Sequence, residues 1–197
     1  MTQTLKKQDF GAPEEFSLYV KNRKEQKSYK SLVLNYLFRM YVFPVKKPIS
    51  ILQYKLMSTK LKIPVNVVRT FIKAFLKDFI KLQEFLNSGD LIFTSRNQAS
   101  QIKVFLHRLY RLAPIFDYKR AKKNAKILKM KLDALYFWPT ITTRVAIIIY
   151  VTDLYDPLQN NKIKQTNLRV LCNCSAYAFH RSRNKIGLSS ISPISSK

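Results

Sequence analysis

Glycine is scarce in this chain, with three residues in 197, and the apolar residues recur every three or four positions rather than alternating. Both facts disfavour a sheet-rich fold and favour helices. The longest apolar run, residues 145–151, is far shorter than the roughly 20 residues that cross a bilayer. The first twelve residues lack the apolar core of a secretory signal. We therefore expect an intracellular protein, cytoplasmic or nucleoid-associated, with no membrane partner.

Cysteine and histidine are equally rare. Cys172 and Cys174 give no disulfide framework, which fits a reducing compartment. Together with His107 and His180 they do not form a recognisable four-ligand zinc pattern, so we interpret both cysteines as small side chains of the core. Cys172 and His180 are eight residues apart across a predicted turn, with the thiol inward and the imidazole outward, which argues against nucleophilic catalysis.

Acidic residues are few and scattered, and no glycine-rich phosphate loop is present. We find no catalytic constellation, and we expect neither an enzyme nor a bound cofactor or metal. What the chain does have is 36 Lys+Arg against 11 Asp+Glu, a formal net charge of +25. Such an excess on helix faces indicates a polyanionic partner, with DNA or RNA first, an anionic membrane second and an acidic protein third.

The apolar content is sufficient for a packed core, since 47% of the residues are hydrophobic and 13 Phe and 11 Tyr are among them. We predict an all-α protein. Residues 1–27 form a basic tail and short helix, 28–90 a three-helix, helix-turn-helix-like module, 91–188 a five-helix domain, and 189–197 a disordered tail. The boundary falls at the turn-forming residues 87–90. Helices are predicted over 13–30, 31–43, 50–60, 64–86, 97–112, 117–136, 140–154, 165–171 and 176–186, with 140–154 as the buried central helix.

The segment 168–186, LRVLCNCSAYAFHRSRNKI, has the layout of a helix-turn-helix. Asn173 suits the turn because it tolerates left-handed backbone, and Ser175 suits the cap of the second helix. Leu168, Leu171, Cys172, Phe179 and Ile186 would face the core. The residues expected to face outward and contact nucleic acid are Tyr177, His180, Arg181, Arg183 and Lys185. The alternative is a helical hairpin in a bundle, with a solvated charged face.

A second segment, residues 50–76, has the same layout, with its turn at Lys62 and Ile63. The residues expected to pack inward are Leu52, Leu56, Leu61, Val68, Phe71 and Ile72. The exposed residues Asn66, Arg69 and Lys73 are candidates for DNA contact.

The predicted helix over 117–136 has one apolar stripe, formed by Tyr118, Ala121, Ala125, Leu128, Leu132 and Leu135. Lysines occupy the opposite side, namely Lys119, Lys122, Lys123, Lys126 and Lys129. Because few carboxylates intersperse them, this face has a single sign and would attract phosphate regardless of sequence.

The order of these segments from about residue 97 to 188 resembles a cyclin-like repeat of archaeal transcription factor B. IKVFLHRLYRLAP is similar to the first helix, YKRAKKNAKILKMKLDALYF to the second and third region, PTITTRVAIIIYVTDLY to the buried fourth helix, and KQTNLRVLCNCSAYAFHRSRNKIGL to the terminal helix-turn-helix. The family's zinc ribbon, which recruits RNA polymerase, has no counterpart because the first half lacks cysteine.

The combined expectation is a DNA-binding protein that modulates transcription, of archaeal or archaeal-virus type, with the transcription machinery as a further partner. Basic helix faces would contact duplex phosphates, and the helix over 176–186 would enter the groove. Two alternatives stay open. One is an RNA-binding protein that docks on structured RNA, and the other is a cyclin-like interaction module for an acidic protein.

Overall fold

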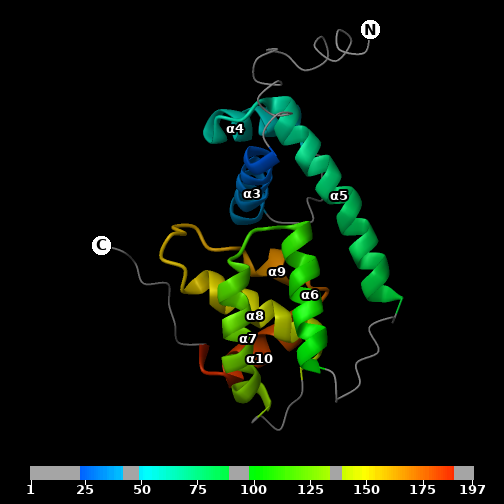
Figure 1. Ribbon diagram of the computed structural model, residues 1–197, viewed down its shortest axis with the longest axis vertical. Helices are drawn as coiled ribbons and strands as arrows, with labels where there is room; N and C mark the ends of the chain where they lie inside the picture. The colour runs from blue at the N-terminus through cyan, green and yellow to red at the C-terminus, as the bar shows by residue number, and fades with distance from the viewer. Residues whose placement is uncertain (1–22, 42–48, 89–97, 134–138, 189–197) are drawn as a thin grey trace.

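A computed structural model describes residues 23–41, 49–88, 98–133 and 139–188, and every regular element within them is a helix (Figure 1). The predicted all-α class is confirmed. The tail at 189–197 and the first part of the helix predicted over 13–30 lie outside these ranges. The helices are α3 (Arg23–Met40), α4 (Ile51–Leu61), α5 (Val65–Asn87), α6 (Gln98–Leu112), α7 (Tyr118–Asp133), α8 (Ile141–Leu154), α9 (Gln165–Leu171) and α10 (Ala176–Lys185).

Three of these helices begin at a hydroxyl side chain that caps the first turn. The Ser50 hydroxyl accepts a hydrogen bond from the Gln53 backbone N–H, and the Gln53 side chain in turn accepts one from the Ser50 N–H. At the starts of α8 and α10, the Thr140 and Ser175 hydroxyls each accept one hydrogen bond from the backbone N–H three residues further on, without the reciprocal bond. Each cap satisfies backbone donors that the first turn leaves unpaired, so these starts are specified locally.

One predicted break is absent. The sequence suggested separate helices over 13–30 and 31–43, but α3 runs without interruption from Arg23 to Met40. The stretch contains neither proline nor glycine, so nothing in the backbone stops the helix where its composition changes from polar to apolar.

Helices α3, α4 and α5 share a small core, which includes Val33, Met57, Val68 and Ile72. Val68, Phe71 and Ile72 are buried as predicted. The prediction for α4 is wrong at two positions: Leu52 and Leu56 are 67% and 48% exposed. α4 instead buries Met57, because its contact face is set by α5 and α3 and the helix is too short for its apolar residues to define one stripe.

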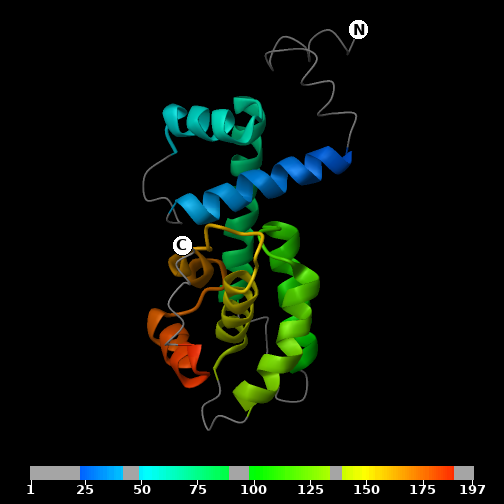
Figure 2. The ribbon, with the colours of Figure 1, turned by 90° about the vertical axis from the view of Figure 1, so that its left-hand side faces the viewer.

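α8 is the central helix of the second half, as predicted. It is buried around almost its whole circumference, and α6, α7, α9 and α10 all pack against it. Seen from the side in Figure 2, α6 and α7 form one layer, α8 the middle, and α9 and α10 the opposite layer. The five helices expected for this half are present, and their cyclin-like arrangement stays a prediction.

Apolar packing continues across the predicted boundary near residue 90. Leu34, Leu37 and Phe38 of α3 and Phe75 and Phe79 of α5 belong to the same core cluster as the interior of α6 to α10. The rings of Phe38 and Phe75 meet edge to face with centroids 5.3 Å apart. α3 therefore packs in the small core on one side and in the large core on another.

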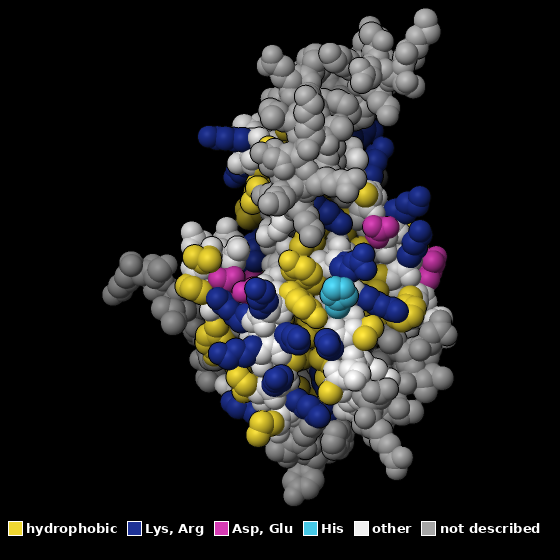
Figure 3. Space-filling model, viewed as in Figure 1, with side chains coloured by type: hydrophobic (Ala, Val, Ile, Leu, Met, Phe, Trp, Pro, Cys, Tyr) yellow, Lys and Arg dark blue, Asp and Glu magenta, His cyan; other side chains and the backbone are white. Residues whose placement is uncertain are grey.

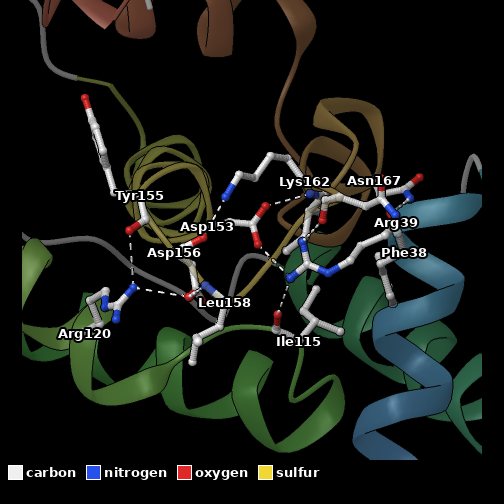
Figure 4. Close-up of polar contacts among 12 residues, drawn as sticks. Phe38, Arg39, Ile115, Arg120, Asp153, Tyr155, Asp156, Leu158, Lys162 and Asn167 are labelled. Carbon is white, nitrogen blue, oxygen red and sulfur yellow. Dashed lines mark hydrogen bonds and ion pairs between the residues drawn. The ribbon is translucent and has the colours of Figure 1, made fainter. Parts of the chain in front are cut away.

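A buried ion pair also links α3 to the second half (Figure 4). The Arg39 Nη2 and Asp153 Oδ1 atoms lie 2.7 Å apart, and the two side chains are only 6% and 4% exposed. Arg39 donates further hydrogen bonds to the carbonyls of Asn161 and Ile115, and the Asp153 carboxylate accepts one from the backbone N–H of Ile163. These bonds compensate much of the cost of removing both charges from water.

The last turn of α3 is completed by α9. The buried Asn167 side chain donates to the carbonyls of Phe38 and Tyr41, at 2.6 and 2.7 Å. The last carbonyls of a helix have no partner within it, and Asn167 supplies one from 129 residues away in the chain. The position of α9 is therefore coupled to the end of α3.

We predict that Asp153→Ala lowers the free energy of unfolding by about 3–5 kcal/mol, because it leaves the Arg39 charge buried without a partner. The matched control is Arg120→Ala, which removes a 3.5 Å pair with Asp156 in which Arg120 is 35% exposed. That change should cost no more than about 1 kcal/mol. Urea unfolding of both variants checks this, and equal losses would contradict a dominant role for the buried pair.

The orientation of α4 gives a second prediction. Met57→Ala should cost about 2–5 kcal/mol because it opens a cavity in the small core. Leu52→Ser should change stability by no more than about 0.5 kcal/mol, since most of that side chain already contacts water. Thermal unfolding distinguishes the two, and a larger loss for Leu52→Ser would mean that α4 buries a different face.

Candidate nucleic-acid interface

α9 and α10 are joined by a tight turn whose geometry follows from two residues. Asn173 adopts a left-handed backbone conformation with φ of 50°, as its place in the turn predicted. The Cys174 backbone N–H donates to the Arg169 carbonyl at 2.9 Å, which closes the end of α9. The Ser175 hydroxyl then accepts from the Ala178 N–H at 3.1 Å and starts α10, as predicted.

The inward face of this unit is apolar and dense. Leu168, Leu171, Cys172 and Phe179 are fully buried, as expected, while Ile186 is half-buried. The Phe179 ring meets the Tyr150 ring of α8 edge to face with centroids 5.7 Å apart. This packing holds α10 against α8 and fixes which of its side chains face outward.

The outward face of α10 is polar, aromatic and positively charged. Tyr177 is 71% exposed, and Arg181 and Lys185 follow it at intervals of one turn on the same face. The Arg181 guanidinium lies over the Tyr177 ring, 5.9 Å from its centroid. With the half-buried His180, these residues lie together on the open face of α10. Four of the five predicted contact residues are thus brought together.

Arg183 is the exception. It is half-buried and lies on the flank of α10 between the outward face and the core, beside the buried Ser182. Its spacing from Arg181 places it away from Tyr177 and Lys185 around the helix. The sequence pattern treated it as equivalent to Arg181, and the structure separates the two.

The predicted lysine face of α7 is present. Lys119, Lys122, Lys123 and Lys126 are all exposed, whereas Ala121, Leu128 and Leu132 of the apolar stripe are buried. Leu135 of that stripe lies outside the described residues. Figure 3 shows Lys and Arg side chains gathered over α6 and α7, with hydrophobic side chains between them.

A groove of about 160 Å³ runs between α6 and α7. Lysines from both helices border it, namely Lys103, Lys122, Lys126 and Lys129. Lys103, which lies on α6, is not among the contact residues predicted from the sequence. Lys103 directly follows Ile102, which belongs to the buried stripe of α6. A lysine at the edge of an apolar stripe is the sequence signal by which it could have been predicted.

The second predicted contact site, on α4 and α5, is formed in part. Lys62 ends α4 with a left-handed φ of 54°, so the turn lies where the sequence placed it. Arg69 and Lys73 are exposed on α5, whereas Asn66 is half-buried. Pro64 stands at the cap position of α5, one residue before its first helical residue.

These basic faces lie on different helices, and α7 and the segment after α10 come together where Lys131 and Ile186 line one hollow. α8 lies between α7 and α10 in Figure 2, and both pack against it. The beginning of α5 lies near α4 at one end of the molecule in Figure 1, and α10 lies toward the other end.

The two cysteines are poorly suited to chemistry at this site. Burial raises the pKa of the Cys174 thiol to about 11, although the nearby Arg169 charge lowers it in part. Burial, with a smaller contribution from Cys174, raises the pKa of the Cys172 thiol well above its usual value. Both thiols are therefore protonated at neutral pH, and a protonated thiol is a poor nucleophile and metal ligand.

Within the described ranges, no group of three or more His, Cys, Asp and Glu side chains is placed to hold a metal ion. None of the helices in those same ranges combines the length and the apolar character that crossing a membrane requires.

Comparison with known proteins adds no further assignment. No protein-family model matches this chain, and no curated protein or solved structure is significantly similar to it. The resemblance to the cyclin-like repeat therefore stays a prediction from the sequence pattern.

Proposed function

We propose that this protein binds duplex DNA and modulates transcription, with α10 as the helix that enters the major groove. The observation that carries the proposal is the exposed row of Tyr177, Arg181 and Lys185 on a helix held rigidly by a capped turn. A recognition helix needs such a fixed orientation, because base contacts are directional.

The dimensions and chemistry of α10 agree with this role. Its ten residues span about 15 Å, and the major groove is about 12 Å wide, so the exposed face can follow the groove floor. Arg181 can donate two hydrogen bonds to the O6 and N7 atoms of a guanine. Tyr177 and Lys185 can contact phosphates on either side and fix the register of the helix.

The net charge of +25 supports a polyanionic ligand independently of α10. Basic side chains away from the contact surface, such as those of α7, raise the local concentration of DNA through their long-range field. Contacts of Lys185 with phosphate displace condensed counterions, so the affinity should fall linearly with salt on logarithmic scales.

Arg181→Ala should weaken binding at a preferred DNA site by about 1–3 kcal/mol and leave binding to unrelated duplex nearly unchanged, if Arg181 contacts a guanine. Arg111→Ala is the matched control, since Arg111 is an exposed arginine at the end of α6, in the layer opposite α10. Fluorescence anisotropy with a duplex selected from a random pool measures both. Equal losses of DNA affinity in the two variants would contradict the proposed position of α10 in the major groove.

Lys185→Ala should reduce the slope of log affinity against log salt by about one, because one phosphate contact is lost. The measurement is a salt titration with labelled duplex DNA, repeated with unlabelled duplex DNA, RNA hairpins and an anionic polymer as competitors. DNA should be the strongest competitor. If the RNA hairpins compete more strongly than duplex DNA, the ligand is RNA. If all three compete equally, the basic surface binds polyanions without specificity.

A further inference from the structure

We propose that the lysine-bordered groove between α6 and α7 is a docking site for an acidic amphipathic helix of a partner protein. The groove belongs to the layer opposite α10, so the inference does not depend on DNA binding. Its border consists of Lys103 on α6 and Lys122, Lys126 and Lys129 on α7, and none of the described residues that line it is a carboxylate.

The groove lysines are available for a partner. In the part of the chain that the structure describes, the ion pairs are Arg39 with Asp153 and Arg120 with Asp156, and neither involves these lysines. The nearest acid at the start of α7, Asp117, accepts a hydrogen bond from the Arg120 backbone N–H. Four positive charges around one groove repel each other, and an anionic ligand relieves that repulsion.

The floor of the groove is apolar. Ile102 and Leu106 form its base, and Ala99, Ala125 and Tyr118 line its sides. The two alanines leave the space, because a larger side chain at either position would fill it. A nucleic acid would satisfy the lysines but leave this floor without an apolar partner. A peptide that brings an aliphatic side chain together with carboxylates satisfies both parts.

The spacing of the lysines favours a helical partner. Lys122, Lys126 and Lys129 follow one another at four and three residues, so they form a row about 10 Å long on one side of α7. A partner helix lying along the groove would present glutamates at the same intervals on one flank. Its apolar stripe would then face Leu106 and Ala125, in the manner of a helix bound in a groove.

The test uses the full chain and a short fluorescent peptide that is helical, with a stripe of leucines bordered by glutamates. The expected result is saturable binding that Lys122→Glu with Lys126→Glu weakens at least about tenfold, since two attractions become repulsions. The matched control, Lys119→Glu with Lys123→Glu, makes the same charge change on the same helix outside the groove lining. It should weaken binding by less than about threefold.

A second peptide distinguishes binding in the groove from general attraction between charges. The same peptide with glutamines in place of its leucines should bind at least about tenfold more weakly, because the floor then gains no apolar contact. The proposal would be overturned if both lysine double variants lost the same peptide affinity. It would also be overturned if the leucine-free peptide bound as tightly as the leucine peptide. Because the two lysine double variants change the net charge equally, they should lower the affinity for duplex DNA to the same extent. A negative result for peptide binding in the groove therefore leaves the α10 proposal separately testable.

Discussion

The buried ion pair between Arg39 and Asp153 is the interaction on which the arrangement of the helices depends. The same guanidinium bonds the carbonyls of Ile115 and Asn161, so the end of α3, the segment after α6, the end of α8 and the segment before α9 meet at one point. Each of these groups is costly to bury alone and is stabilised only when the others are in place. Asn167 then couples α9, and with it the turn and α10, to the end of α3.

The burial of α8 on all sides determines what the remaining helices can offer to partners. Because α8 provides the apolar surface for both layers, α7 and α10 each direct their polar faces outward, away from one another. The positive charge is thereby divided between separate surfaces of different chemistry. α10 presents Tyr177, Arg181 and Lys185 in a row on one helix, whereas α6 and α7 enclose an apolar groove within a lysine border.

Local signals in the sequence predicted the helix limits well, because caps and turns act over a few residues: Ser175 and Asn173 behave as expected, and α9 has the predicted bounds. Contacts between distant segments could not be predicted in this way. Asp153 is one of the few, scattered acidic residues of the sequence, and nothing in its neighbourhood in the chain indicates Arg39. The exposure of Leu52 and the groove position of Lys103 likewise depend on which face a neighbouring helix covers.

In the proposed complex α10, and not the lysine face of α7, contacts the DNA. Hydrogen–deuterium exchange with and without a selected duplex distinguishes the two helices, because it reports every helix in one experiment. We expect slower exchange from the turn at residues 172–175 through α10 when DNA is bound, with α7 unchanged. Slower exchange in α7 or the start of α5, with α10 unaffected, would contradict it.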